Sequence, residues 1–391
     1  MKVELEKGIY WVGAIDWNIR DFHGYSTHLG STYNAYLVMG EKTALVDTVK
    51  NPFFEEMLGR ISELISPKKI DYLIVNHVEM DHSGSLTRLK EAVPGVEILC
   101  SPRAEGELRL HYPKDIPLRV VKTGDTLELG GKTLTFVEVP MVHWPDSMVT
   151  YLREDKVLLP NDAFGQHIAS TERFDDELGW ETILPEAAKY YANIVMPYGP
   201  QVLKALEALS GIEIDVIGPS HGIIWRKHIP DILATYQKWA KGVTEQRAVI
   251  AYATMWGSTE KMAKAICKGL ADEGIPTRMY RLKGSDQSDI VKELLESRAL
   301  LVGSPTLNNG LFPSVAAFST YIKGLRPRGR LAGAFGSYGW GGGAIKALNA
   351  DLQTAGMDVL EELQVQFVPD AEKLKECEQW GREVAQKIRG A

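Results

Sequence analysis

The nine-residue stretch NHVEMDHSG, residues 76–84, follows the apolar run YLIV and carries four side chains that can bind metal. In an extended chain, His77 and Glu79 point to the same side. A turn into a helix after them would bring Asp81 and His82 back beside that pair. A charged cluster that is only solvated would not need two imidazoles at this spacing, so the stretch indicates a metal site at the end of a strand.

Three further candidates follow other strand-like runs. They are His143 in VPMVHWPD, Asp162 in LLPNDAFG and His221 in IGPSHG. A single histidine after a strand is usually structural, so the prediction depends on the whole set. Four imidazoles and three carboxylates are enough for two metal ions, and a carboxylate with two oxygens is the natural bridge between them. We therefore predict one catalytic, metal-binding centre made of His77, Glu79, Asp81, His82, His143, Asp162 and His221.

The residues around this cluster indicate an α+β domain over residues 1–243. Strand-like segments come first, then a helix at 53–65, then further βα units, and finally the strands TLTFVEVP, SMVTYLRE and DVIG. This order predicts two sheets covered by helices, a four-layer αβ/βα sandwich. His167 and the segment Asp16–Gly24 are expected to wall the pocket rather than to bind metal, because the ligand set is already complete.

The polar stretch WAKGVTEQR, residues 239–247, separates this part from a second domain over residues 248–391. Strand runs (AVIAYAT, MYRL, ALLVGS, LAGAFGS and MDVLEE) alternate there with helical patterns. Such alternation is typical of βαβ units and predicts an α/β fold with a doubly wound parallel sheet.

Three loops of the second domain follow strands and are candidates for binding a cofactor. Residues 254–262, TMWGSTEKM, place hydroxyl groups before a helix, an arrangement that binds a phosphate, although the same hydroxyls could simply cap the helix. The loop lacks the spacing of a nucleotide triphosphate site. Loops 304–310 and 336–343 supply glycines and Trp340 for a flat ring. The predicted binding residues are Thr254, Met255, Trp256, Gly257, Ser258, Thr259, Pro305, Thr306, Leu307, Asn308, Asn309, Gly310, Ser337, Tyr338, Gly339, Trp340, Gly341 and Gly342.

Composition excludes several classes of protein. With 391 residues, 45% of them hydrophobic, the chain is globular and large enough for two or three domains. No apolar run is long enough to span a membrane and no export signal is recognisable, so a soluble, cytoplasmic protein is expected. The three cysteines include no CxxC pair, which argues against a disulfide framework and a cysteine-ligated iron centre. The net charge of −7 and the lack of a basic stripe argue against nucleic acid as a partner.

These motifs carry a family resemblance that covers nearly the whole chain. The pattern HxExDH, followed by a distant His, Asp and His, is similar to the metallo-β-lactamase superfamily, which usually has histidine at the position of Glu79. Glutamate there, together with HWPDSM, LPNDAFGQH and PSHGIIWR, resembles the A-type flavodiiron proteins. The three loops of the second domain resemble flavodoxin, which implies flavin mononucleotide (FMN) rather than FAD.

The resemblance implies two irons per chain. One would be held by His77, Glu79 and His143, the other by Asp81, His82 and His221, with Asp162 as the bridge. It also implies an oxidoreductase that reduces O2 to water, NO to N2O, or both, with electrons passed through FMN from an external donor such as a rubredoxin-like protein or a reduced deazaflavin. The sequence does not choose between the two gases.

A head-to-tail homodimer is a further implication of the resemblance. The residues before Ala248 carry a net charge of −9 and those from it onward +2, so this arrangement places fewer like charges together. Trp144, Trp225 and Trp340 are the candidate interface side chains. Two other functions stay open: a zinc-dependent hydrolase with a regulatory flavodoxin domain, and a flavodoxin-type electron carrier with a metal-free structural domain.

Overall fold

The computed structural model describes residues 3–390. The chain divides into two compact units, and each is described by itself: unit 1 runs to Tyr190 and resumes at Pro200–Gln237, while unit 2 contains Tyr191–Gly199 and the residues from Lys238 onward. The stretch Tyr191–Gly199 is bound to the rest of unit 2 by the side chain of Asn193. Its Nδ2 donates to the Ser288 carbonyl (3.1 Å), and its Oδ1 accepts from the Tyr321 hydroxyl (2.6 Å). The domain ranges 1–243 and 248–391 stay predictions.

Unit 1 is built on two large sheets, beside two short two-stranded ones that pair β3 Ala14–Asp16 with β6 Ser31–Tyr33 and β4 Asp21–Phe22 with β5 Tyr25–Ser26. The first is mixed and has the order β1-β2-β7-β8-β9-β10-β11, with β1 Val3–Glu6, β2 Ile9–Trp11, β7 Tyr36–Met39, β8 Thr43–Val46, β9 Tyr72–Val75, β10 Glu97–Cys100 and β11 Leu118–Val120. The second has the order β12-β13-β14-β15-β16, with β12 Thr126–Glu128, β13 Thr133–Glu138, β14 Met148–Leu152, β15 Val157–Leu159 and β16 Val216–Ile217.

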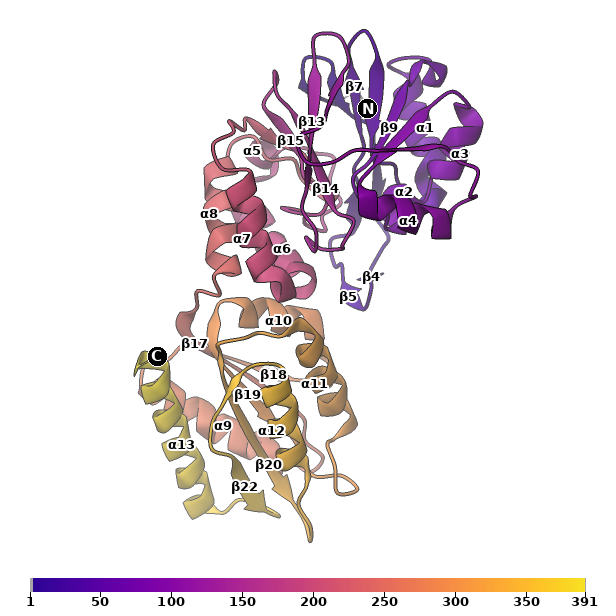
Figure 1. The fold of residues 1–391 in the computed structure, drawn as a ribbon. Helices are drawn as coiled ribbons and strands as arrows, with labels where there is room; N and C mark the ends of the chain where they lie inside the picture. The colour runs from indigo at the N-terminus through magenta and orange to yellow at the C-terminus, as the bar shows by residue number, and fades with distance from the viewer. Residues whose placement is uncertain (1–2, 391) are drawn as a thin grey trace. The chain divides into compact units, whose positions relative to one another are not determined.

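Alternation along the strands of the first sheet explains the layers. In β9, Leu73 and Val75 face the core shared with helices, whereas Ile74 faces the core between the two sheets. Successive side chains of a strand point to opposite faces, so a strand buried on both sides is apolar throughout. The helices that cover the first sheet are α1 Phe54–Ser62, α3 Leu86–Ala92 and α4 Pro102–His111. The helices on the side of the second sheet are α6 Trp180–Tyr190, α7 Gly199–Ala208 and α8 Ile229–Ala240 (Figure 1). The predicted four-layer sandwich is confirmed.

Asn76, directly after β9, ties the edges of the two sheets together. Its carbonyl accepts from the Met148 N–H (2.9 Å), and its side chain accepts from the Thr150 hydroxyl (2.8 Å) and donates to the Leu159 carbonyl (3.1 Å). The end of β9 therefore lies beside the strands of the second sheet. Residues that follow β9, β13, β15 and β16 meet at this edge, which is where the predicted metal ligands lie.

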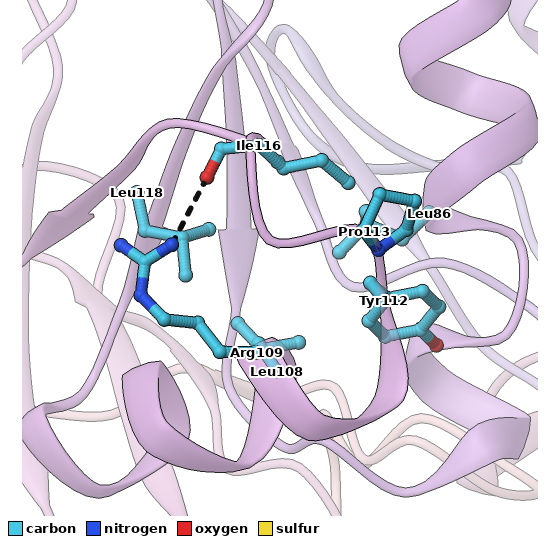
Figure 2. Close-up of a pocket in the computed structure, with 7 residues that line it drawn as sticks. All are labelled: Leu86, Leu108, Arg109, Tyr112, Pro113, Ile116 and Leu118. Atoms are coloured by element: carbon cyan, nitrogen blue, oxygen red, sulfur yellow. Dashed lines mark hydrogen bonds between the residues drawn. The ribbon is translucent and has the colours of Figure 1, made fainter.

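A small cavity lies beneath the segment that leads from α4 to β11. It is lined by the side chains of Leu86, Leu108, Tyr112 and Ile116, among others, and Arg109 donates to the Ile116 carbonyl across it (Figure 2). Its volume of about 10 Å³ is close to the least that holds one water molecule. The Tyr112 hydroxyl lies outside this cavity and contacts the Ser83 hydroxyl at 2.7 Å.

Unit 2 is a parallel sheet with the order β18-β17-β19-β20 followed by β21, and β22 also pairs with β20. The prediction of a doubly wound sheet is confirmed, although the fifth strand is split into two short pieces. The strands are β17 Glu245–Tyr252, β18 Thr277–Arg281, β19 Ser297–Gly303, β20 Leu331–Tyr338, β21 Asp358–Val359 and β22 Leu363–Gln366. The helices are α9 Ser258–Asp272, α10 Gln287–Leu295, α11 Pro313–Leu325, α12 Ala344–Thr354 and α13 Ala371–Gly390.

The helix α9 begins where Gly257 adopts a left-handed conformation, with φ at +87°, which glycine reaches without steric cost. The turn directs the N-terminus of α9 to the carboxyl edge of the sheet. On one face, α9 and α13 pack together over β17, β19 and β20, with Met262, Ile266 and Val384 in their shared core. Among the helices described, none combines the length and the apolar composition that crossing a bilayer requires.

The three tryptophans proposed for an interface lie in different surroundings. Trp225 is fully buried in unit 1 and its indole N–H donates to the Phe164 carbonyl (2.9 Å), so its predicted interface role is wrong. Trp144 is half-buried, with its ring 5.0 Å from that of His77. Trp340 is 93% exposed, so its side chain is accessible to a partner and its predicted interface role stays a prediction.

Candidate metal centre and cofactor cavity

Four of the predicted ligands form one group at the edge of the two sheets: His77, Glu79, His143 and Asp162. Glu79 Oε2 lies 3.2 Å from His77 Nε2 and 3.4 Å from His143 Nε2. Asp162 Oδ2 lies 3.3 Å from His143 Nε2. The side chains of Glu79 and His143 are each 12% exposed, whereas that of His77 is fully buried. This group is therefore open to the outside on the side of Glu79 and His143.

The other three predicted ligands, Asp81, His82 and His221, form a second group. The helix α2, Met80–Ser83, is a single turn that follows Glu79 and turns Asp81 and His82 inward. His221 Nε2 lies 3.1 Å from Asp81 Oδ2, and His82 Nε2 lies 3.4 Å from Asp81 Oδ1. All three side chains are buried, so this group is less accessible than the first.

Asp162 joins the two groups through its two oxygens. Its Oδ2 faces His77 and His143, while its Oδ1 lies 3.2 Å from His82 Nε2 and 3.5 Å from His221 Nε2. One carboxylate thus lies between two sets of three side chains. This is the geometry that a bridging ligand between two metal ions requires.

Unsatisfied polar atoms at the cluster fit metal binding. Among the described residues, both oxygens of Asp81, both oxygens of Asp162 and both ring nitrogens of His82 are buried without a hydrogen-bond partner. Buried polar atoms are normally paired, because leaving one unpaired costs about 1–3 kcal/mol. Metal ions held at about 2.0–2.2 Å from nitrogen and oxygen ligands would satisfy the four carboxylate oxygens and Nε2 of His82, the ring nitrogen that faces Asp81 and Asp162. The seven residues therefore suit a pair of ions.

Further residues orient the ligands, and sequence reasoning missed them. Asp146 accepts from His77 Nδ1 (2.9 Å) and from the Val78 N–H (2.7 Å), which leaves Nε2 of this histidine directed at the cluster. The Thr32 carbonyl accepts from His221 Nδ1 at 2.6 Å, which likewise leaves Nε2 of His221 directed at the cluster. A carboxylate three residues after His143, in HWPDSM, was the available signal for Asp146. A backbone carbonyl such as that of Thr32 leaves no signal in the sequence.

The electrostatics of the seven ligand residues favour positive charge between them. Burial opposes the charged form of each group, but the hydrogen bond to Asp146 helps to raise the pKa of His77 well above its usual range. Nearby carboxylates likewise overcome burial and raise the pKa of His82 to about 10. In spite of burial, the neighbouring imidazoles hold the pKa of Asp162 well below its usual range. The carboxylates thus remain charged and stabilise cations beside them.

The two histidines predicted to wall the pocket lie at its edge. His23, 54% exposed, places Nε2 at 3.3 Å from Glu79 Oε1. His167 is buried, with Nδ1 2.7 Å from the Ser31 hydroxyl and its ring 4.9 Å from that of His221. Burial and the nearby His221 lower the pKa of His167 well below its usual range, so this imidazole is neutral. Neither belongs to the two ligand groups.

Unit 2 contains a cavity of about 750 Å³ at the carboxyl edge of its sheet. The ends of β17, β19 and β20 meet there, so the three predicted loops share one wall. Trp256 and Trp340 stand at its rim and are 92% and 93% exposed. The lining residues are Thr254, Met255, Trp256, Ser258, Pro305, Thr306, Leu307, Asn308, Asn309, Ser337, Tyr338, Gly339, Trp340, Gly341, Phe367 and Val368.

Most of the predicted cofactor residues lie on this wall, with four exceptions: Gly257, Thr259, Gly310 and Gly342. Thr259 is buried behind the wall, with its hydroxyl 3.2 Å from that of Ser337. Sequence reasoning missed Phe367 and Val368, which follow β22. The available signal was the alternation of Leu363, Val365 and Phe367, which continues a strand to the same edge.

Both units match known families. Residues 32–222 match the family described as ODP family beta lactamase, and residues 250–381 match flavodoxin. These ranges contain all seven predicted metal ligands and all three loops of the cofactor cavity, respectively.

Relatives extend the similarity to the whole chain. The chain is 49% identical to a nitric oxide reductase of Moorella thermoacetica, over 99% of this chain and 98% of that protein. Among solved structures, the rubredoxin oxygen:oxidoreductase of Desulfovibrio gigas has a TM-score of 0.97 and 43% identity, covering 100% of this chain and 99% of that one. A flavodiiron protein of Giardia intestinalis has the same TM-score at 34% identity, with 100% and 97% covered. A similarity this high, extending through both units, makes this chain a member of the flavodiiron protein family and an oxidoreductase.

Proposed function

We propose that this protein reduces O2 to water, NO to N2O, or both, at a pair of irons in unit 1, with electrons received through FMN in unit 2. The observation that carries the proposal is the position of Asp162, whose two oxygens face two separate groups of histidines and carboxylates. The names of the relatives, nitric oxide reductase and rubredoxin oxygen:oxidoreductase, support both gases as substrates.

The ligand set favours iron over zinc. Glu79 adds a carboxylate to the first group, and mixed histidine and carboxylate ligation suits a metal that changes oxidation state. When bound, a pair of irons supplies a redox-active site that a small gas can reach. The irons would be held by His77, Glu79 and His143 on one side and by Asp81, His82 and His221 on the other, with Asp162 between them.

The protein's own residues control access and protons. The second group is buried, so a gas molecule reaches the cluster from the side of Glu79 and His143. Reduction of O2 to two waters consumes four electrons and four protons, and reduction of two NO to N2O and water consumes two of each. His23 connects the cluster to solvent, because its side chain is 54% exposed and its Nε2 lies 3.3 Å from Glu79 Oε1.

The cavity of unit 2 suits FMN. A helix N-terminus favours an anion, so the phosphate is placed at the start of α9 beside Ser258. The volume of about 750 Å³ falls within the range of ligand pockets, and the exposed indoles of Trp256 and Trp340 offer flat faces to a flavin ring. FMN supplies the electrons that the gas consumes.

Electrons arrive from an external donor, a rubredoxin-like protein or a reduced deazaflavin, since the sequence offers no cysteine-ligated centre of its own. The name of the Desulfovibrio gigas relative, rubredoxin oxygen:oxidoreductase, supports the first of these. The described cysteines, Cys100, Cys267 and Cys377, are all free, which fits a reducing compartment and supports the cytoplasm as the location.

We further infer a head-to-tail homodimer, in which the flavin of one chain serves the metal centre of its partner. Exposed Trp340 at the rim of the cofactor cavity supports a contact there. Complementation tests this: a chain made iron-free by His143→Ala is mixed with a chain made FMN-free in its phosphate loop, and subunits are exchanged. Activity should return. Inactive exchanged dimers would show that electrons travel within one chain.

The central test combines gas consumption with cofactor analysis. The purified, reduced protein is given O2 and NO separately, and iron, zinc and flavin are measured in the same sample. Asp162→Ala should lower iron content and turnover together, whereas Asp176→Ala, which loses an ion pair with Arg226 outside the cluster, should change neither. An iron-replete and fully active Asp162→Ala protein would contradict the proposal. Two zinc ions without iron would favour the zinc-dependent hydrolase.

A further inference from the structure

A second small cavity in unit 1 lies between the second sheet and the helix α7, and we call it the α7 cavity. Val149 of β14 forms one wall, and Val202, Ala205 and Leu206 of α7 form the opposite wall. Its volume is about 20 Å³. The least that holds one water molecule is about 10–15 Å³ on the same measure, so this cavity has room for one small molecule.

The α7 cavity is apolar. Among the described residues that line it, none presents a polar atom to it. Tyr236 is the one lining side chain with a hydroxyl group, and that hydroxyl accepts the Phe164 N–H at 2.7 Å. A water molecule needs two to four polar partners, so a cavity lined only by apolar atoms favours an apolar occupant over water.

The α7 cavity lies next to two segments that carry predicted metal ligands. Val142 and Ala163 line it, and they are the chain neighbours of His143 and Asp162, two of the residues proposed to bind iron. Both belong to the ligand group that is the more open of the two. On the opposite side the cavity reaches Ala205 and Leu206, which are half-buried, so α7 separates it from solvent by one layer of side chains.

We propose that the α7 cavity is a binding site for one apolar diatomic molecule, from which O2 or NO reaches the metal centre. This inference rests on the proposed function, because it assigns the cavity to the substrates of that reaction. O2 and NO share the relevant chemistry: both are small, uncharged and more soluble in an apolar medium than in water. The site therefore concentrates either gas beside the segments that carry His143 and Asp162 while it excludes water.

Xenon tests the binding site without any reference to activity. Crystals of the protein are pressurised with xenon, and we expect a xenon atom between Val149 and Val202. Ala205→Leu places a larger apolar side chain in the cavity and should abolish xenon binding there. Ala208→Leu is the matched control, because it makes the same change on the same helix at an exposed position outside the cavity.

Kinetics test the role in substrate delivery, with O2 and NO measured in separate arms. Ala205→Leu should lower kcat/KM for the gas by about tenfold, because the larger side chain fills the cavity, while kcat at saturating gas stays unchanged because no metal ligand is altered. Ala208→Leu should leave both values unchanged. Leu206→Ala, which widens the wall facing solvent, is a second variant and should raise xenon occupancy and kcat/KM.

The possible results separate this inference from the proposed function. A wild-type protein without xenon in the α7 cavity overturns the inference, whatever its activity. An unchanged kcat/KM in Ala205→Leu, or in Leu206→Ala if the former does not fold, also overturns it. If wild-type protein binds xenon there but consumes neither gas, the binding site stands and the proposed function fails.

Discussion

Asp146→Asn is the perturbation that best separates a residue that positions a metal ligand from one that only stabilises the fold. Asp146 is buried and its carboxylate accepts from His77 Nδ1 (2.9 Å) and from the Val78 N–H (2.7 Å). Asparagine keeps the size of the side chain and one acceptor oxygen. Oδ2 accepts both of these hydrogen bonds, and Oδ1 also lies 3.1 Å from His77 Nδ1. The uncharged amide puts an NH2 group, which cannot accept, in one of these two positions, so a hydrogen bond to His77 Nδ1 is lost together with the negative charge.

The expected magnitude follows from the lost hydrogen bond. A buried hydrogen bond to a charged group contributes about 1.5–3 kcal/mol. If it holds the imidazole of His77 in place for the metal, its loss should weaken metal binding by about 10–100-fold, as is typical for outer partners of metal ligands. This factor corresponds to about 1.4–2.7 kcal/mol, so the two estimates agree.

The assay needs a control that loses equal stability at another site. Asp175 is also buried, and its carboxylate accepts backbone N–H groups of Arg226 (2.9 Å) and His228 (2.7 Å). Asp175→Asn should therefore lower the free energy of unfolding, measured in urea, by a similar amount. The metal-free proteins are titrated with Co²⁺ against a competing chelator. Only Asp146→Asn should lose metal affinity.

Two results would refute this reasoning. Unchanged Co²⁺ affinity in Asp146→Asn would mean that the hydrogen bond does not orient His77 for the metal. An equal loss of affinity in Asp175→Asn would mean that metal binding responds to general stability rather than to the position of one imidazole. FMN content should be unchanged in both variants, because they alter unit 1 only.

Three further predictions concern other parts of the molecule. Ser83→Ala should weaken Co²⁺ binding more than Tyr112→Phe, because the Ser83 hydroxyl donates to a buried backbone carbonyl in the metal-binding loop while the Tyr112 hydroxyl only supports it. Ser258→Ala should weaken FMN binding by about 1.5–3 kcal/mol in a flavin titration, if this residue donates to the phosphate. Burial acts to raise the pKa of Glu296, but hydrogen bonds from Trp239 and a lysine hold it below its usual value. Glu296 therefore stabilises unit 2 above about pH 4.5, and this contribution is lost as the pH falls below that value, so Glu296→Gln should flatten the acid side of the pH–stability curve.

Each of these predictions has its own control and contrary result. Equal metal affinity in Ser83→Ala and wild type would show that the loop is held without this hydroxyl. Iron should remain in Ser258→Ala, and unchanged FMN affinity would leave the loop as an ordinary helix start. Glu293→Gln is the control for Glu296, because it is also half-buried and lies in the same helix region. If Glu296→Gln keeps the same acid sensitivity as wild type and Glu293→Gln, the argument from the hydrogen bonds to Glu296 fails.

The sequence predicted the kinds of chemistry from local patterns. NHVEMDHSG combines an apolar strand with four ligand-type side chains, so strand, turn and ligand types can be read within nine residues. Alternating strand and helix runs predicted the parallel sheet of unit 2 for the same reason. Periodicity reflects which face of an element is buried, and this property extends over a few residues only.

The tertiary structure alone decided which atoms face each other. The two oxygens of Asp162 divide the other six ligands into two groups of three because β9, β13, β15 and β16 end at one edge, and strand pairing sets that edge. Burial of Trp225 and the arrival of Phe367 at the cofactor cavity are likewise products of packing. Contacts between residues far apart in the chain depend on how whole layers pack together. A local pattern contains the residue types for such contacts but not the register that brings them together.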